Sequence, residues 1–181
     1  MLRVFLSLIA IATTAAWAQT PAARPNLSGI WQAMNTANWD LQTHGAQAGS
    51  VAALGAVGTI PPGMGVVEGD AIPYLPAAGA KKKENNAKRW TDDPELKCYL
   101  PGVPRATYMP HPFQILHTGN NIMFLYQYAG AVRNINMEKA TEAPTDSWMG
   151  WSNGRWEGNT LVIDVTGFND QTWFDRAGNY H

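Results

Sequence analysis

The sequence predicts a mainly β protein, built as an antiparallel barrel or sandwich, with a lipocalin-like barrel as one form of it. Two segments carry this prediction: residues 113–137 contain three β-rich runs separated by turns, and residues 155–165 contain two more. Turn residues also recur at regular spacing elsewhere in the chain. The pattern indicates about seven short strands and one short helix.

The first segment has the pattern of a three-stranded meander with two-residue turns at residues 119–120 and 129–130. In this register Tyr126 lies opposite Phe113 on one side and opposite Arg133 on the other. Because strand side chains alternate between faces, these three residues share one face, which is the expected core face. Its other members are Ile115, His117, Ile122, Phe124, Ile135 and Met137.

The second segment reads as a hairpin that turns at residues 158–159, a Gly-Asn pair suited to a tight turn. This turn places Trp156 opposite Leu161 on an apolar face. On the other face Arg155 lies diagonal to Asp164, so we expect an exposed ion pair that contributes little to stability.

The remainder of the chain is less regular. A short strand is expected at residues 27–32, followed by a long N-terminal loop at 45–69 that is rich in Gly, Ala and Val. One polar helix is expected over residues 77–90, ended by the Asp-Asp-Pro sequence at 92–94. Four prolines within 101–112 then require an extended or turning chain.

The N-terminus has the pattern of a secretory signal peptide spanning residues 1–18. Arg3 precedes an apolar run of about 13 residues, and Ala-Trp-Ala follows it with small residues at the positions that signal peptidase reads. The run is shorter than the roughly 20 residues that a membrane-spanning helix needs. We therefore expect a periplasmic or secreted protein with no membrane span after cleavage, consisting of one β-rich domain at 19–181.

Composition excludes several classes of partner. Loss of Arg3 with the signal peptide shifts the net charge from −1 to about −2, and the only basic cluster, Lys81 to Lys83, is interrupted by Glu84. No nucleic-acid partner is expected. The single Cys98 cannot form an internal disulfide, so it is expected to be buried and inert, with a reactive or intermolecular role as the alternatives.

Familiar catalytic and cofactor motifs do not occur in the sequence. There is no P-loop, no dinucleotide-binding glycine motif, no His-Glu-x-x-His, no Cys-x-x-Cys and no Gly-x-Ser-x-Gly. We therefore expect no cofactor and no metal site, and the sequence leaves the oligomeric state open.

Three stretches resemble a widespread family of exported bacterial β-rich proteins. They are CYLPGVPR at 98–105, MPHPFQI at 109–115, and GRWEGNTLVIDVTGFNDQTWFDRAGNYH at 154–181. In that family the last motif runs on past the histidine into further strands, so the resemblance implies export, β-rich architecture and a chain truncated at its C-terminus. It implies no particular reaction.

Arg133 is the main candidate for ligand binding. On the expected core face beside Tyr126, its charge is costly unless paired, and a ligand carboxylate or phosphate would pair it with bidentate geometry. Arg105 in the proline-rich segment could assist this anion site, and Trp173 could border it. The alternatives are a structural ion pair or an exposed face.

A second set of residues could act in catalysis. Asp170, Asp175 and His181 lie close in sequence and could supply an acid and a base, and His111 is held rigidly between two prolines. Asp170 and Asp175 could equally be turn residues that bond their own backbone.

Three functions remain open from the sequence. The first is a small-molecule-binding protein that uses Arg133, and the second is an extracytoplasmic hydrolase or lyase that uses the His and Asp side chains. The third is a carbohydrate-binding or cell-surface interaction module, for which Trp148 and Trp151 should be exposed.

Overall fold

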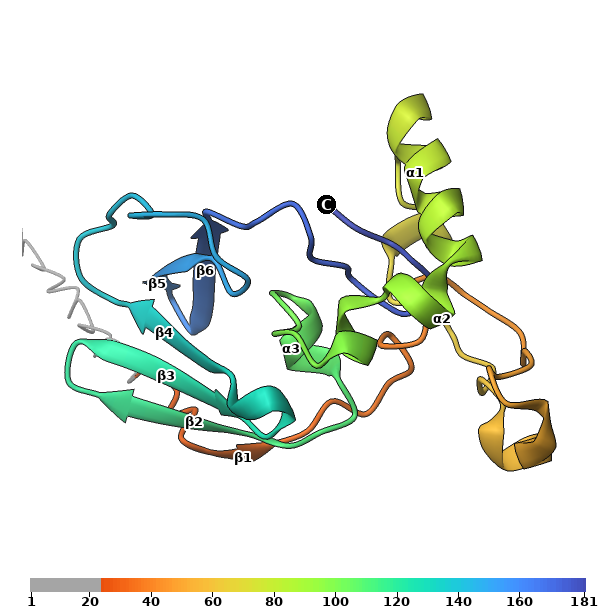
Figure 1. The fold of residues 1–181 in the computed structure, drawn as a ribbon. Coiled ribbons are helices and arrows are strands. Elements are labelled where there is room, and N and C mark those ends of the chain that lie inside the picture. The colour runs from red at the N-terminus through yellow and green to blue at the C-terminus, as the bar shows by residue number, and fades with distance from the viewer. Residues whose placement is uncertain (1–23) are drawn as a thin grey trace, which may run out of the picture.

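The computed structural model describes residues 24–181, so the predicted signal peptide lies outside the described residues. A six-stranded sheet forms one end of the molecule, two helices and several loops form the other, and the short helix α3 lies between them (Figure 1). The strands are β1 (Gly29–Trp31), β2 (Phe113–Thr118), β3 (Asn121–Tyr126), β4 (Val132–Asn136), β5 (Trp151–Glu157) and β6 (Thr160–Thr166). The α-helices are α1 (Pro76–Ala87), α2 (Arg89–Asp92) and α3 (Arg105–Tyr108), and the 3₁₀ helices are η1 (Ala52–Gly58), η2 (Glu68–Asp70), η3 (Pro94–Lys97) and η4 (Tyr128–Gly130).

The protein is mainly β, as predicted, but the sheet is neither purely antiparallel nor closed into a barrel. The strands follow chain order from β1 to β6, and every neighbouring pair is antiparallel except β4 and β5, which are parallel. The parallel pair requires residues 137–150 to return the chain to the starting end of β4 before β5 begins. Within the described chain β1 and β6 do not pair, so both remain edge strands.

The predicted meander is confirmed for its first hairpin and corrected for its second. Phe113 pairs with Tyr126 as expected. Arg133 pairs with Phe124 rather than Tyr126, because η4 replaces the expected two-residue turn with a longer loop. The register therefore moves by two residues, and a shift of two leaves every side chain on the same face.

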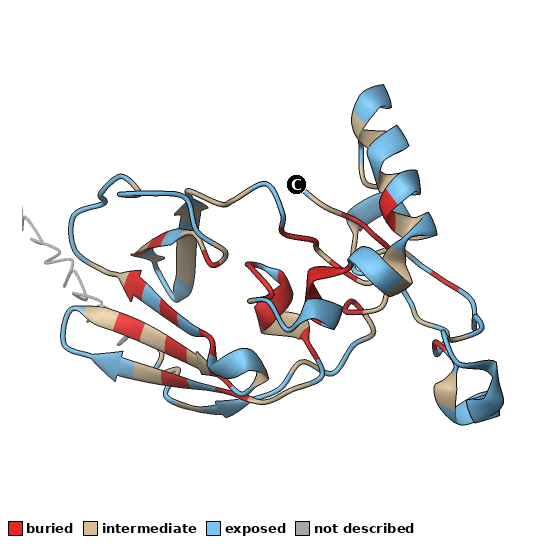
Figure 2. Ribbon diagram, viewed as in Figure 1, coloured by how far each residue is buried: buried red, intermediate tan, exposed pale blue. Residues whose placement is uncertain are grey.

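The inner face of the sheet and α3 enclose the hydrophobic core. Buried residues alternate along β2, β3 and β4 and recur on α3 (Figure 2). The buried cluster contains Val103, Ala106, Phe113, Ile115, Ile122, Phe124, Tyr126, Ala131, Ile135 and Met149. The predicted core face is therefore correct over its centre, but His117 at its end is exposed.

The second hairpin forms as predicted around Gly158. Trp156 pairs with Leu161, and Gly158 has a positive φ of 60°, which a residue without a Cβ adopts at little cost. On the outer face Arg155 forms ion pairs with Asp164 and with Glu157.

Replacing Arg155 by methionine is expected to leave the stability of the protein unchanged. Its side chain is 51% exposed and its Asp164 partner 66% exposed, so solvent screens the attraction and flexible side chains lose entropy on pairing. Urea denaturation of the variant and the wild type should give coincident curves. A clear loss of stability would mean that the ion pairs order the hairpin.

Residues 24–181 contain three α-helices where the sequence predicted one. The helix expected over residues 77–90 is divided at Lys88 into α1 and α2, and α3 adds a third short helix. The chain after β6 crosses to this end of the molecule (Figure 1). There Asn86 Nδ2 donates to the Ala177 carbonyl over 2.9 Å, and a Cβ on Gly178 would lie 2.7 Å from the Asn86 backbone nitrogen.

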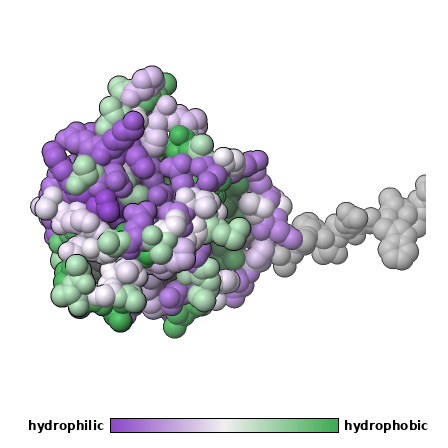
Figure 3. Space-filling model, turned by 90° about the vertical axis from the view of Figure 1, so that its right-hand side faces the viewer, coloured by the Kyte–Doolittle hydropathy of each residue, from purple (hydrophilic) through white to green (hydrophobic). Residues whose placement is uncertain are grey.

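The predicted N-terminal loop contains η1 and η2 and is tied by two isolated β-bridges, His44 to Gly63 and Gln47 to Ile60. On the face of the molecule that carries α1 and α2, hydrophilic residues cover a broad area and hydrophobic residues form separate patches around it (Figure 3). No helix among residues 24–181 combines the length and apolar character needed to cross a bilayer. Cys98 is exposed, contrary to the expectation of a buried thiol.

Candidate functional site

A cavity of about 630 Å³ opens between the edge strand β6 and helix α3. Such a volume lies within the range of small-molecule sites. Its walls are mostly apolar, and four polar side chains reach it from different parts of the chain. The lining residues are Val103, Pro104, Thr107, Tyr108, Arg133, Leu161, Ile163, Val165, Phe168, Phe174 and His181.

Arg133 reaches this cavity from β4 and is the only cationic side chain of fixed charge that residues 24–181 contribute to it. The residue is 7% exposed, its Nε donates to Ser152 Oγ over 2.9 Å, and its guanidinium lies 5.8 Å from the centre of the Phe124 ring. No Asp or Glu among residues 24–181 forms an ion pair with it. A buried charge without a counter-charge is costly, so the arrangement favours an anion from outside the chain.

Tyr126 is buried beside Arg133, as the sequence predicted for this face. Burial lowers the pKa of the Arg133 guanidinium, and the neighbouring Tyr126 hydroxyl opposes the shift. The group stays cationic, because a guanidinium is not deprotonated in proteins. The Tyr126 hydroxyl also lies 3.3 Å from Thr107 Oγ1, which links β3 to the cavity wall formed by α3.

His181 and Tyr108 add two polar groups to the cavity. The His181 ring packs against Phe168 and Phe174, with centroids 4.7 Å and 5.4 Å away, and its Nε2 contacts Thr172 Oγ1. Burial lowers the pKa of His181, so the imidazole is largely neutral at pH 7. The Tyr108 hydroxyl donates to the Phe174 carbonyl over 2.7 Å, which fixes this aromatic wall.

Arg105 lies outside the cavity and has protein carboxylates as partners. Its two terminal nitrogens donate to the Asp93 carboxylate over 2.8 and 2.9 Å, and Nη2 also donates to Glu95 Oε2. Arg176 contacts the same Glu95 carboxylate from the C-terminal segment. The structure therefore separates Arg105 from Arg133 and places it in a buried ion cluster.

The candidate catalytic residues do not converge on one cavity. Asp175 is fully buried, and its carboxylate accepts four hydrogen bonds from Leu41, Ala177 and Asn179. Asp170 is exposed and lines a different hollow from His181.

His111 and Trp173 also lie outside the Arg133 cavity. The His111 ring stacks on Tyr128 at 5.7 Å between centroids. Trp173 is 8% exposed and borders the same hollow as Asp170. No group of three or more His, Cys, Asp or Glu side chains in the described part of the chain is arranged to hold a metal ion.

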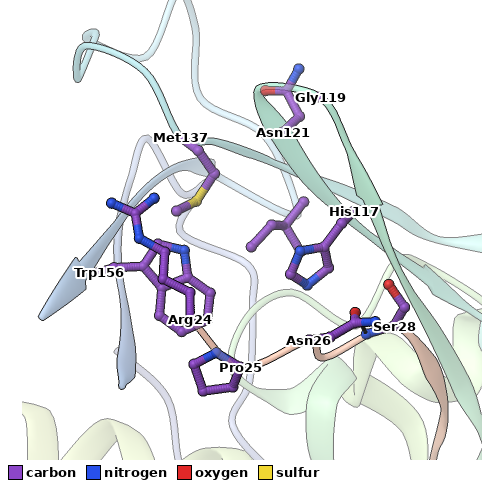
Figure 4. Close-up of a pocket in the computed structure, with 10 residues that line it drawn as sticks. Arg24, Pro25, Asn26, Ser28, His117, Gly119, Asn121, Met137 and Trp156 are labelled. Carbon is purple, nitrogen blue, oxygen red and sulfur yellow. Dashed lines mark hydrogen bonds between the residues drawn. The ribbon is translucent and has the colours of Figure 1, made fainter. Parts of the chain in front are cut away.

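A second cavity, of about 430 Å³, lies at the opposite end of the sheet. His117 points into it from β2, Met137 and Trp156 border it, and residues 24–28 form its lower rim (Figure 4). His117 Nε2 accepts a hydrogen bond from the Leu27 backbone over 3.3 Å. Both His117 and Arg24 are exposed, so this cavity offers solvated polar groups but no buried charge.

The sequence identified Arg133 and the apolar face of β6, but not that the two would meet. No sequence pattern indicates Tyr108, because a single helical turn between prolines has no hydrophobic periodicity. The sequence predicts His181 as a candidate catalytic group beside Asp170 and Asp175, but it lines the Arg133 cavity, which neither aspartate borders.

Comparison of the chain with protein-family models, with curated proteins and with solved structures gives no significant match. The assignment of a function therefore rests on the geometry of the site.

Proposed function

We propose that this protein binds a small amphipathic anion, with an apolar or aromatic body and a carboxylate or similar acidic group, in the cavity between β6 and α3. The observation that carries the proposal is the buried Arg133 guanidinium, which lines the cavity and has no carboxylate partner within residues 24–181. The acidic group of the ligand pairs with it in bidentate geometry.

The rest of the cavity determines the character of the ligand body. Leu161, Ile163 and Val165 form one wall from β6, and Phe168 and Phe174 form another. Apolar surface of this kind favours a hydrocarbon or ring system by removing it from water. The neutral His181 imidazole offers a hydrogen bond without a second positive charge.

The proposal includes export, so that binding takes place in the periplasm or outside the cell. Its support is the signal-peptide pattern at residues 1–18 and the resemblance of residues 98–105 and 154–181 to exported proteins. No catalytic step is included, because the candidate acid and base residues do not line one cavity.

Replacing Arg133 by methionine is expected to weaken binding of an anionic probe while leaving a neutral probe of the same shape bound. The matched probes are 8-anilinonaphthalene-1-sulfonate and N-phenyl-1-naphthylamine, which share an aromatic skeleton and differ in the sulfonate. Loss of charge-assisted hydrogen bonds should raise the dissociation constant of the anionic probe by about 10- to 100-fold. Fluorescence titration of each probe measures the effect.

Two further variants act as controls. Arg155→Met removes an exposed arginine elsewhere and should change neither titration, and Arg133→Lys keeps the charge but not the planar fork, so it should retain part of the anion affinity. Equal loss of both probes in Arg133→Met, or loss of neither, would overturn the proposal. Should Arg133→Met fail to fold, Arg133→Lys decides. If Arg133→Lys folds but does not bind the anionic probe, Arg133 has a structural role and the proposal is overturned.

A further inference from the structure

A strip of aromatic side chains lies outside the Arg133 cavity and is not used by the proposed function. It consists of Tyr99, Trp148 and Trp151, which we call the aromatic strip. Tyr99 is 46% exposed and Trp151 is 37% exposed, whereas Trp148, which was also expected to be exposed, is half-buried. The rings of Tyr99 and Trp148 are in contact, with centroids 5.1 Å apart.

Two hollows meet at Trp148. One, of about 310 Å³, is bordered by Tyr99 and Trp148, and the other, of about 670 Å³, by Trp148 and Trp151. Two short stretches of chain border both hollows. Tyr99 lines the smaller one and Leu100 the larger, and Asn169 lines the larger one while residues 170–171 line the smaller. The two hollows therefore lie next to each other on the two sides of Trp148, and we call them together the cleft. None of the residues that line it borders the Arg133 cavity.

Polar groups without protein partners face this cleft. Five polar side chains form no hydrogen bond with another residue of the described chain. In the smaller hollow they are Asp92, Lys97, Asp170 and Gln171, and in the larger one Asp146. Two lysines and two aspartates balance each other in the smaller hollow. The cleft thus offers hydrogen bonds with little net charge, which suits a neutral polar ligand better than a polyanion.

The backbone holds the aromatic strip in place before any ligand binds. Ser147 N donates to the Gly167 carbonyl over 2.8 Å, and Met149 is buried in the core, so Trp148 is fixed on both sides. Trp151 is fixed through its Nε1, which donates to Thr141 Oγ1 over 3.0 Å. A preorganised surface loses little conformational entropy on binding.

From these observations we infer that the cleft along the aromatic strip binds a neutral oligosaccharide. The C–H faces of pyranose rings pack on aromatic rings, and their hydroxyl groups hydrogen-bond to carboxylate, amide and ammonium side chains. Because the cleft extends to both sides of Trp148, it takes a chain of sugar units rather than a single ring.

The inference is tested by calorimetric titration of the full chain with cellohexaose, chitohexaose, xylohexaose and maltohexaose. At least one hexasaccharide should bind, and it should bind about tenfold or more tightly than the disaccharide of the same linkage, because the disaccharide reaches only one hollow. Absence of binding by all four at millimolar concentration overturns the inference.

Variants locate the binding. Trp148→Ala should weaken it by about tenfold or more, whereas Trp31→Ala, which removes an exposed tryptophan of β1 outside the cleft, should leave it unchanged. Arg133→Met should also leave it unchanged, so this result and the result for the anion cavity are independent.

Gln171→Ala covers the case in which Trp148→Ala fails to fold, because the exposed Gln171 side chain contributes to the cleft but not to the core. It should weaken hexasaccharide binding by about threefold or more. Binding that is unchanged in Gln171→Ala and in every folded variant of the aromatic strip would overturn the inference.

Discussion

Replacing Arg105 by methionine is expected to lower the free energy of unfolding by about 3–5 kcal/mol. Arg105 is 1% exposed, and it is the cation that pairs with the buried Asp93 carboxylate. Its removal leaves the buried Asp93 carboxylate without a counter-charge, while Glu95 keeps a second partner in Arg176. Urea denaturation in the absence of any ligand measures the loss.

A double variant separates charge from packing. Asp93→Asn keeps an oxygen for the backbone N–H of Glu95, which Asp93 Oδ1 now accepts over 2.9 Å, but it removes the charge. The double variant Arg105→Met/Asp93→Asn should lose about 1–3 kcal/mol less unfolding free energy than the sum of the losses in the two single variants. Arg155→Met is the matched control. If Arg105→Met is as stable as the wild type, Arg105 does not hold this cluster and is free for another role.

The same cluster should govern resistance to acid. Burial acts to raise the pKa of Glu95, but hydrogen bonds and charge from Arg176 and Arg105 hold it below its usual value. A depressed carboxyl pKa contributes stability that is complete above the unfolded pKa, 4.5, and is lost as the pH falls through the folded pKa. Arg105→Met weakens this effect, so its acid unfolding, followed by circular dichroism, should begin at higher pH than that of the wild type.

Replacing Asp175 by alanine is expected to cost at least about 3 kcal/mol of stability, the second large effect. The Asp175 carboxylate accepts hydrogen bonds from the backbone of Leu41, Ala177 and Asn179 and from the Asn179 side chain. Alanine leaves these buried donors without an acceptor and detaches the segment around Leu41 from the C-terminal segment. Thermal unfolding measures the change, and a stability close to that of the wild type would contradict it.

The pH dependence of Asp175 provides a second test with a defined sign. Burial raises its pKa to about 6, against the opposing bonds from Asn179 and Leu41. Between the unfolded value of 3.8 and about 6, the folded state therefore binds the proton more tightly than the unfolded state. The contribution of Asp175 to stability is thus highest below about pH 4 and falls as the pH rises to about 6.

The variant Asp175→Asn lacks this titration. The stability of the wild type minus that of Asp175→Asn should therefore decrease by up to about 3 kcal/mol between about pH 4 and pH 7. Denaturation curves at several pH values measure it. An increase over this range would mean that the four hydrogen bonds dominate and hold the pKa of Asp175 low.

The residues of the Arg133 site were only partly predictable. Arg133 and Tyr126 were placed on one buried face because strand alternation survives a register shift of two residues. The partners of Arg105 were not predicted, since Asp93 and Glu95 lie in an irregular segment that has no period from which to infer a direction. Arg176, which completes the cluster at Glu95, lies 81 residues away in sequence.

The sequence by itself determined the β-rich character of the chain, the first hairpin, the hairpin that turns at Gly158 and the centre of the core face of the sheet. These features depend on local alternation and on turn residues, which act between neighbours in the chain. It predicted about seven strands, whereas the sheet has six. Only the tertiary structure decided that β5 runs parallel to β4, that the sheet stays open, and that Arg133, Tyr108 and His181 border one cavity. Those outcomes depend on how irregular segments cross the sheet, and contacts between distant residues decide that path rather than any local pattern.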